Sequence, residues 1–152
     1  MKKRMDEEQE EMPRWDLNDL SEAVATLKRG GLILYPTDTI WGIGCDATNA
    51  DAVSRIFALK QRDDAKALLS IVSSDGMLAQ VVRTIPDIAY DMMDTATKPL
   101  TIIYPDAVGL APNLLAEDGS AGIRVVGDPF CKKMCERLGG PIVSTSANIS
   151  GE

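Results

Sequence analysis

The chain has 152 residues, of which 45% are apolar and 26% are charged, and its formal net charge is −7. This length predicts one domain with a substantial core, and the composition is ordinary for a soluble globular protein. The acidic balance argues against extended nucleic-acid binding, because proteins that neutralise many phosphates are usually basic. No apolar run approaches the roughly 20 residues of a membrane span, and the charged N-terminus does not resemble a secretory signal. We therefore expect a cytoplasmic protein with no membrane contact.

The residue types that are missing exclude several kinds of chemistry. The chain has no histidine, which removes Ser-His-Asp and Cys-His nucleophile systems and argues against a zinc site. Its three cysteines indicate no disulfide framework. Cys131 and Cys135 lie one turn apart on a predicted helix, and a structural role as buried thiols is favoured over a redox or metal role. An enzyme of this composition must work with Lys, Arg, Ser, Thr, Asn and Asp, or with a metal held by oxygens.

The N-terminal part divides into a tail and the start of the folded region. Residues 1–14 are a charge run without a periodic apolar face, which predicts a solvated tail. We expect a single domain over residues 15–152. Helical spacing of apolar residues predicts a first helix that is capped by Asn18 and runs to Lys28. The Gly30-Gly31 pair then ends this helix.

Two extended segments follow the first helix. Residues 32–35 are wholly apolar, which predicts a strand buried on both faces, and Pro36 ends it. Residues 40–46 predict a second strand, whose two glycines permit close approach of another backbone. These glycines also imitate a dinucleotide-binding fingerprint. That interpretation is disfavoured, because the acidic pair at 63–64 falls in a charged turn and such lone patterns have many false positives.

The next predicted element is a helix that carries a lysine on its inner face. Apolar spacing predicts this helix from Asn49 or Asp51 to about Lys60. Lys60 lies four residues after Ile56 and three after Phe57, so it continues the buried stripe. A lysine there must snorkel, pair with a partner or meet an anion. Spacing alone favours the first of these, with the stem on the core and the ammonium in water.

The rest of the chain continues the alternation of strands and helices. This alternation predicts an α/β layer fold, and extended segments around Pro and Gly indicate that part of the sheet is antiparallel. The methionines of the helices are interpreted as core filler. The predicted strands cover residues 67–72, 100–104 and 122–126, and the predicted helices cover residues 77–82, 86–95 and 129–138.

The last segment passes from an apolar run into short polar side chains. Residues 141–143 read as a buried strand, and three hydroxyls and an amide follow at 144–148. Ligands in open α/β sheets bind outside the carboxyl ends of strands. This segment is therefore predicted to form a ligand-binding edge.

Eight polar residues stand out along the chain, at strand ends or on an inward face. Arg124, for example, lies in the middle of a predicted strand, where burial is costly unless the guanidinium is paired. Cations combined with hydroxyls and an amide suit a phosphate or carboxylate ligand. The residues alone thus predict a site for an anionic small molecule, best interpreted as a nucleotide. The eight residues are Thr37, Lys60, Arg62, Thr101, Arg124, Ser144, Ser146 and Asn148.

Five sequence blocks carry a specific pattern: YPTDTIWGIGCDA at 35–47, KQR at 60–62, KPLTI at 98–102, GIRV at 122–125 and STSANISG at 144–151. These blocks resemble those of the YrdC family and occur in the family's order. Lys60 and Arg62 match its Lys-x-Arg element, and Ser146 and Asn148 match its Ser-x-Asn element. The resemblance covers the chain from about Gly31 to the end.

The resemblance implies a fold, an activity and partners. The family fold is an open, twisted, mixed α/β sheet with helices packed on it, around a positive cavity first considered a site for double-stranded RNA. The activity implied is that of a threonylcarbamoyl-AMP synthase, which condenses L-threonine, bicarbonate and ATP, with Mg²⁺, and releases pyrophosphate. The threonylcarbamoyl group later passes to an adenosine beside the anticodon of certain tRNAs. We therefore expect tRNA, or the proteins of a tRNA-modification complex, as downstream partners.

The resemblance also implies a role for each candidate residue. Lys60 and Arg62 are expected to act as the catalytic pair on the triphosphate or carbamate anion. Thr37 and Arg124 are expected near threonine. No protein-held metal is expected. The nucleotide or Mg²⁺-linked contacts are assigned to Lys60, Arg62, Thr101, Ser144, Ser146 and Asn148.

The chain departs from the family pattern at three places. Residues 63–68 read DDAKAL, where the family usually has a Pro and then a Pro-Leu pair, and Thr97-Lys98 replaces the more usual Pro-Gly. The sequence stops at Glu152, where relatives continue with further strands and a nucleotide-contacting segment, so a truncated copy is expected. Two alternatives stay open. One is a non-catalytic relative of the YciO type that binds RNA or a nucleotide, and the other is a carbamoyl-transfer domain like those of hydrogenase maturation proteins.

Overall fold

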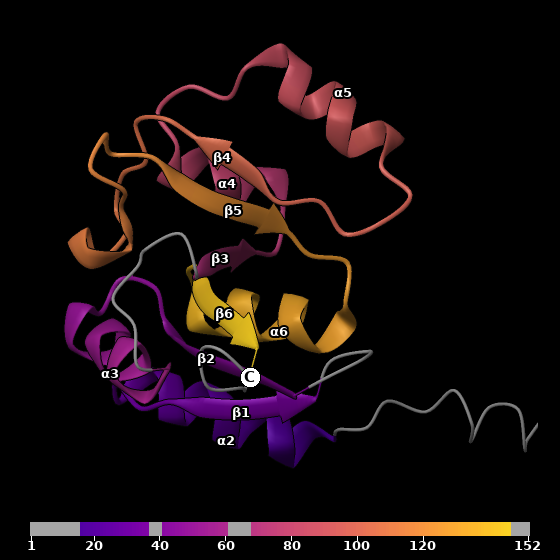
Figure 1. The fold of residues 1–152 in the computed structure, drawn as a ribbon. Helices are drawn as coiled ribbons and strands as arrows, with labels where there is room; N and C mark the ends of the chain where they lie inside the picture. Colours follow the sequence, from indigo (N-terminus) through magenta and orange to yellow (C-terminus); the bar gives the residue numbers. More distant parts are fainter. Residues whose placement is uncertain (1–15, 37–40, 61–67, 147–152) are drawn as a thin grey trace, which may run out of the picture.

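The computed structural model describes residues 16–36, 41–60 and 68–146. The predicted tail and the predicted site residues Thr37, Arg62 and Asn148 lie outside these ranges. No helix in the described ranges is long and apolar enough to cross a membrane. The elements are α2 (Leu17–Lys28), β1 (Ile33–Pro36), β2 (Trp41–Asp46), α3 (Ala50–Lys60), β3 (Leu69–Val72), α4 (Asp75–Val81), α5 (Asp87–Thr95), β4 (Ile102–Tyr104), the 3₁₀ turn η2 (Pro112–Leu114), β5 (Ala121–Val125), α6 (Pro129–Leu138) and β6 (Ile142–Ser146) (Figure 1).

The strands of the described ranges form one mixed sheet in the order β1-β2-β6-β3-β5-β4. Figure 1 shows them stacked from β1 at the bottom to β4 near the top. β3 and β5 are parallel, and the other neighbouring pairs are antiparallel. β6 is the last strand in the sequence, yet it lies in the middle of the sheet between β2 and β3. The prediction of an open, mixed α/β sheet is confirmed.

One face of the sheet is covered by a large apolar cluster. Residues that are directly paired across neighbouring strands share a face, and the pairing places Cys45, Val143 and Ile123 together on this one. They pack with Ile56 of α3 and Leu78 of α4 in the same core cluster. We call this the closed face.

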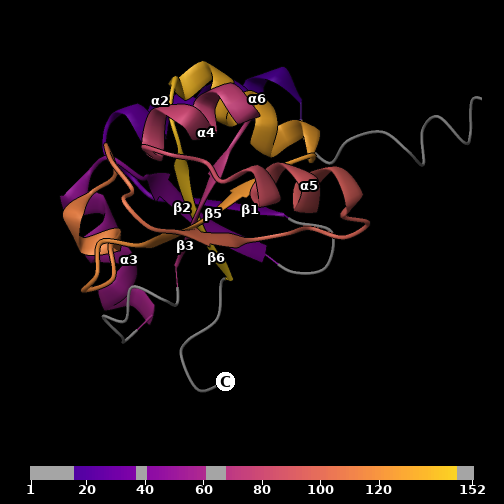
Figure 2. The same cartoon turned by 90° about the horizontal axis from the view of Figure 1, so that it is seen from above.

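The opposite face is covered only in part. Tyr35 of β1 and Ile71 of β3 lie on it and pack with α2 and α6, which Figure 2 shows together on one side of the strands, away from α3. Ser144, Ser146 and Arg124 also belong to this face by their pairing, and they are only half-buried. We call this the open face.

Short polar side chains cap the amino ends of the two helices that frame the open face. α2 starts with a capping box, in which the Asp16 carboxylate accepts from the Asp19 backbone N–H at 2.8 Å and the Asp19 carboxylate accepts from the Asp16 N–H at 3.0 Å. The prediction of Asn18 as the cap is therefore wrong, because the helix begins two residues earlier. α6 is capped by Asp128 and ends at Gly139 in the left-handed conformation, as its sequence pattern predicts.

Two apolar segments are more exposed than their sequences predict. The apolar run of β1 predicts burial on both faces, but β1 is an edge strand, and Leu34 is 62% exposed. The spacing in α5 predicts a buried stripe that includes Ile88 and Met92, yet these side chains are 65% and 43% exposed. α5 lies beyond the edge strand β4 (Figure 1), so only Ala89 of this helix is buried. Both differences arise from the position at the sheet margin, which a local apolar pattern does not encode.

The three cysteines are buried, which confirms the structural interpretation of Cys131 and Cys135. Burial raises the pKa of Cys45 and that of Cys135 to about 12, so both thiols are neutral at physiological pH. Within the described ranges, no group of three His, Cys, Asp or Glu residues is arranged to hold a metal ion.

Candidate active site

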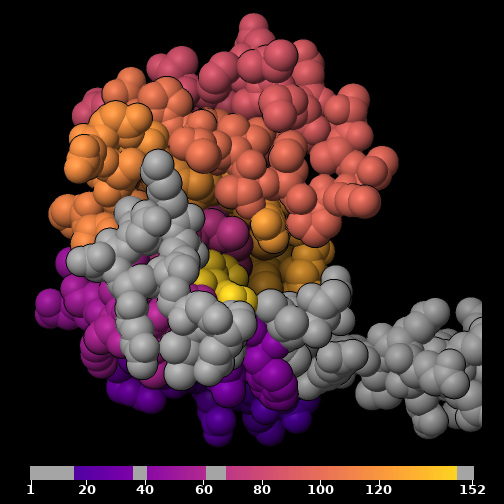
Figure 3. Space-filling view, viewed as in Figure 1, coloured from indigo at the N-terminus to yellow at the C-terminus, as the bar shows by residue number. Residues whose placement is uncertain are grey.

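The open face carries a cavity of about 1140 Å³. In Figure 3 the surface is hollowed between the upper and lower halves of the molecule, and the yellow atoms of β6 lie at the bottom of the hollow. The floor consists of strand residues of the open face, and the walls are residues 93–94 and 96–100 and the first turn of α6. Small-molecule sites usually enclose about 300–1,000 Å³, so this cavity has room for a nucleotide and a second small ligand.

Two of the predicted residues, Ser144 and Ser146, line the cavity from β6. The Ser144 hydroxyl is hydrogen-bonded to the phenol of Tyr35, which reaches across β2 from the edge strand. Because β6 is antiparallel to β2 and β3, its carboxyl end meets the amino ends of those strands at Gly42 and Leu69. The predicted ligand edge is therefore a stretch of the sheet's face, to which only some strands contribute their carboxyl ends.

Lys60 ends α3 at the same end of β6. Its side chain is 5% exposed, and its Nζ donates to the Ser146 carbonyl oxygen at 2.9 Å and to the Ser146 hydroxyl at 3.4 Å. The ammonium is thus buried and paired, and the prediction that it snorkels into water is wrong. A buried cation next to a cavity acts on a bound anion through a medium of low dielectric constant, where the attraction is stronger than in water.

Arg124 lines the cavity from β5, and a hydrogen bond holds its side chain. Its Nε donates to the Thr101 hydroxyl at 2.9 Å. This contact supplies the partner that a half-buried guanidinium needs. Thr101 is not itself among the residues that line the cavity. It lies behind Arg124, and the direct nucleotide contact expected of Thr101 stays a prediction.

The structure therefore places five of the eight predicted residues around one region of the open face. Arg124, Ser144 and Ser146 line the cavity, while Lys60 and Thr101 do not line it and are hydrogen-bonded to Ser146 and Arg124. The others, Thr37, Arg62 and Asn148, lie outside the described residues.

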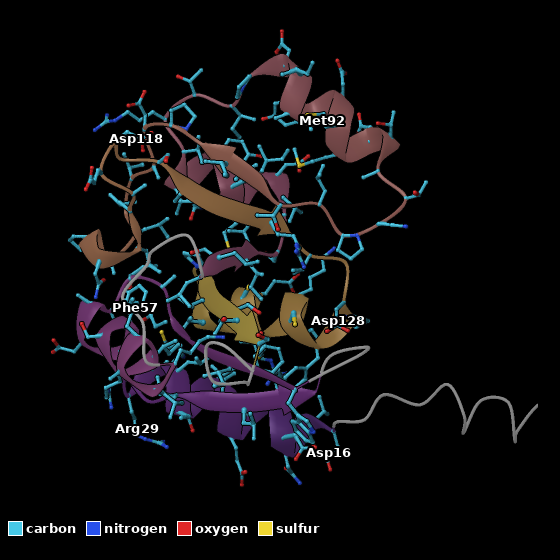
Figure 4. The ribbon with its side chains drawn as sticks, viewed as in Figure 1. Asp16, Arg29, Phe57, Met92, Asp118 and Asp128 are labelled. Atoms are coloured by element: carbon cyan, nitrogen blue, oxygen red, sulfur yellow. The ribbon has the colours of Figure 1, made fainter. Side chains whose placement is uncertain are left out.

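Several cavity residues escape the sequence analysis. Tyr35 and Trp41 line the cavity, although their sequence context indicates only that they belong to strands. A phenol in an otherwise apolar strand is the available signal, because a buried tyrosine hydroxyl usually has a hydrogen-bond partner. Asp128, labelled in Figure 4 at the start of α6, also lines the cavity.

The described part of the lining is not predominantly positive. Its cations are Lys98 and Arg124, and its carboxylates are Asp75, Asp94 and Asp128. The positive cavity that the resemblance implies is therefore not found in these residues alone. Lys60, buried behind Ser146, adds a further cation outside the lining.

Comparison with known proteins gives a consistent result. The family model described as "Telomere recombination", of Sua5, YciO and YrdC, matches residues 25–152. A protein of Chromohalobacter salexigens named threonylcarbamoyl-AMP synthase is 37% identical over 134 residues, which cover 88% of this chain and 72% of that protein. The crystal structure of P. abyssi Sua5 complexed with L-threonine matches with a TM-score of 0.82 at 27% identity. The crystal structure of E. coli YciO matches with a TM-score of 0.75 at 26% identity.

The match covers a smaller share of each of the two solved proteins than of the curated relative. The match covers 92% of this chain but 42% of P. abyssi Sua5, and 88% of this chain but 65% of YciO. The chain therefore spans less than two thirds of these two solved proteins. The synthase name of the curated relatives favours the predicted synthase over the non-catalytic alternative. Because the family model matches most of the chain and the fold agrees, the protein belongs to the Sua5/YciO/YrdC family.

Proposed function

We propose that this protein is a threonylcarbamoyl-AMP synthase, which condenses L-threonine, bicarbonate and ATP to threonylcarbamoyl-AMP and pyrophosphate. The observation that carries the proposal is the cavity on the open face, where Arg124, Ser144 and Ser146 share one space and Lys60 is buried behind Ser146. A guanidinium and hydroxyls on a common wall suit ligands with phosphate and carboxylate groups. The curated relatives that carry this name support the proposal.

The chemistry suits a chain that lacks histidine. The amine of threonine and bicarbonate form an N–C bond and release water, which gives a carbamate. A carbamate oxygen then attacks the α-phosphorus of ATP, and the bond to the β-phosphate oxygen breaks as pyrophosphate leaves. This reaction requires anions to be held in line and their charge to be stabilised, with no protein nucleophile.

In our proposal the candidate residues stabilise charge, orient threonine or bind the nucleotide. Lys60 and Arg62 stabilise the negative charge of the triphosphate and the carbamate, while Arg124 and Thr37 orient threonine. Ser144, Ser146 and Asn148 hold the nucleotide by hydrogen bonds. The ammonium of Lys60 is already fixed on Ser146, so it needs little reorganisation when the substrates bind.

Mg²⁺ is assigned to the substrate in this proposal. No cluster of carboxylates or thiols in the described ranges is suited to hold it, so we infer that Mg²⁺ enters with the triphosphate, whose charge it partly neutralises. The product is an activated acyl adenylate, which a later enzyme transfers to tRNA. A cytoplasmic location, where ATP and tRNA are both available, is part of this proposal.

The test is pyrophosphate release from ATP with Mg²⁺ and bicarbonate, measured with and without L-threonine. We expect release that requires threonine, that is slower with serine, and that is lost in Lys60→Ala. Lys28→Ala, which removes an exposed lysine at the end of α2, is the matched control and should retain full activity. Release that ignores threonine, or no release by a protein that still binds ATP, would contradict the proposal.

A further inference from the structure

The side chain of Tyr35 is unusually well fixed for a residue of an edge strand. It is 2% exposed, although its neighbour Leu34 is 62% exposed. The ring lies against two glycines of β2. A Cβ atom added at Gly42 would lie 3.0 Å from Tyr35 Cζ, and one at Gly44 would lie 3.2 Å from Tyr35 Cε1. Only a strand without side chains at these two positions leaves space for the ring.

The other side of the ring meets α6. The ring centroids of Tyr35 and Phe130 are 6.4 Å apart, within the range of favourable aromatic pairs. The ring is thus held between the backbone of β2 and a helix that covers the open face. The position of the phenol oxygen is consequently determined by packing.

The hydroxyl of Tyr35 meets the Ser144 hydroxyl, which lines the cavity. A phenol is a far stronger acid than an aliphatic alcohol, so the favoured arrangement has Tyr35 donating and the Ser144 oxygen accepting. Burial raises the pKa of Tyr35 above its ordinary value, which keeps the phenol protonated and able to donate. The Ser144 proton must then point to a partner other than Tyr35.

We infer that Tyr35 is a positioning residue, which fixes the Ser144 hydroxyl as a hydrogen-bond donor to an anionic oxygen of the ligand. The inference rests on the proposed function, because that function supplies such oxygens in the phosphates of ATP and in the carboxylate and carbamate of threonine. Within the described ranges, Tyr35 is the hydrogen-bond partner of the Ser144 side chain, and both residues line the cavity, so a bound ligand can reach the Ser144 hydroxyl. Without the phenol hydroxyl, the serine side chain is free to occupy other rotamers, and its donor loses its direction.

The expected effect is that of one hydrogen bond. A neutral hydrogen bond contributes about 0.5–1.5 kcal/mol net, so Tyr35→Phe should weaken binding of the affected ligand by roughly 2- to 13-fold. Ser144→Ala should weaken binding of the same ligand by at least as much. The double variant should bind like Ser144→Ala alone, because Tyr35 acts through Ser144.

The experiment is a double-mutant cycle measured by calorimetry on the full chain. ATP with Mg²⁺, pyrophosphate and L-threonine are titrated separately into the parent protein, the two single variants and the double variant. A loss for both ATP and pyrophosphate identifies a phosphate oxygen as the partner, and a loss for threonine alone identifies its carboxylate. Tyr104→Phe removes the hydroxyl of another buried tyrosine outside the cavity lining, and it should leave all three affinities unchanged.

Several outcomes would overturn the inference. One is unchanged affinity in Tyr35→Phe, and another is a further loss when Tyr35→Phe is added to Ser144→Ala. If Tyr35→Phe fails to fold, unchanged affinity in Ser144→Ala still overturns it. A non-additive cycle in a protein that releases no pyrophosphate would defeat the proposed function and leave the inference standing. Threonine-dependent release together with unchanged ligand affinity in Tyr35→Phe would support the proposed function and overturn the inference.

Discussion

The two faces of the sheet are built in different ways. On the closed face, apolar side chains of β2, β3, β5 and β6 pack against α3, α4 and η2 in one large cluster. On the open face, α2 and α6 cover only part of the strands, and the rest is the cavity. The half-buried polar side chains there are held by hydrogen bonds, Ser144 by Tyr35 and Arg124 by Thr101. The difference indicates that the closed face carries most of the stability, while the open face offers a cavity with polar side chains.

Lys60 connects the two faces. It belongs to α3, whose apolar stripe packs on the closed face, yet its ammonium ends on Ser146 beside the cavity. Changes on either face and at this connection should therefore have separable effects on stability and activity.

The largest effect is expected when a core side chain of the closed face is shortened by mutation. Ile56 is fully buried in the cluster of α3, so Ile56→Ala should lower the free energy of unfolding by about 2–5 kcal/mol. Leu34→Ala on the exposed side of β1 should change it by less than about 0.5 kcal/mol. Urea unfolding measures both. Equal losses would show that the closed face does not dominate stability.

The next largest effect is expected at Lys60, the residue that connects the two faces. Lys60→Met keeps the length of the side chain and removes the ammonium, so pyrophosphate release should fall roughly a hundredfold, which is about 2.7 kcal/mol of transition-state stabilisation. Stability should change far less than activity, because the buried charge is costly to the fold. Parallel assays of activity and urea unfolding separate these effects. A variant that loses stability and keeps its activity per folded molecule would assign Lys60 to the fold alone.

A methyl group added at Gly44, between the strands, should lower the free energy of unfolding by a smaller amount. In Gly44→Ala the new Cβ would lie 2.8 Å from the Val143 carbonyl oxygen and 3.2 Å from the Tyr35 ring. Overpacking of this kind costs about 1–3 kcal/mol, and we expect that loss in urea unfolding. Gly140→Ala meets no atom within 4 Å and serves as the control. A loss as large in the control would show that backbone freedom, rather than crowding at Tyr35, is responsible.

The buried thiols predict a loss of stability at alkaline pH. Their pKa is raised to about 12 in the fold but is about 8.5 in an unfolded chain. Above pH 9 the unfolded state therefore binds fewer protons than the native state, and stability falls as pH rises, by about 1 kcal/mol per pH unit for each thiol. Cys45→Ala should make the slope between pH 9 and 10.5 shallower by that amount. A slope that does not depend on Cys45 would contradict this account.

The smallest effect is expected when Arg124 loses its hydrogen bond to Thr101. Thr101→Val removes the hydroxyl that accepts from Arg124 Nε and conserves the volume of the side chain. The guanidinium should lose its orientation, and ligand affinity should fall about threefold, within the range of a single hydrogen bond. Calorimetry with L-threonine and with ATP identifies which ligand Arg124 binds. An unchanged affinity for both would remove Thr101 from the site.

The sequence predicts local features better than distant contacts. The spacing of apolar residues correctly predicts α3 and the inward direction of Lys60, and Asp128 and Gly139 mark the ends of α6. The partner of Lys60 is 86 residues away in the chain, and the partner of Ser144 is 109 residues away. Such pairs depend on strand order, which local periodicity does not contain.

Strand order also explains the errors in burial. Leu34 of β1 and Val143 of β6 both lie in short apolar runs, yet Leu34 is largely exposed and Val143 is fully buried. An apolar run alone cannot distinguish them, since edge and central strands can share the same composition. Placing β6 in the middle of the sheet leaves β1 at the margin and exposes one side of it. The same arrangement brings the hydroxyls of β6 to the centre of the open face.

The packing of the Tyr35 ring against Gly42 and Gly44 limits which substitutions this protein can accept during evolution. Positions 35, 42 and 44 share one volume, and position 144 shares a hydrogen bond with the first of them. A side chain larger than glycine at 42 is acceptable only with a smaller residue at 35, and the loss of the phenol leaves the hydroxyl at 144 without the contact that orients it. These positions should therefore covary among relatives, and substitutions at them should be tolerated together where they are not tolerated singly.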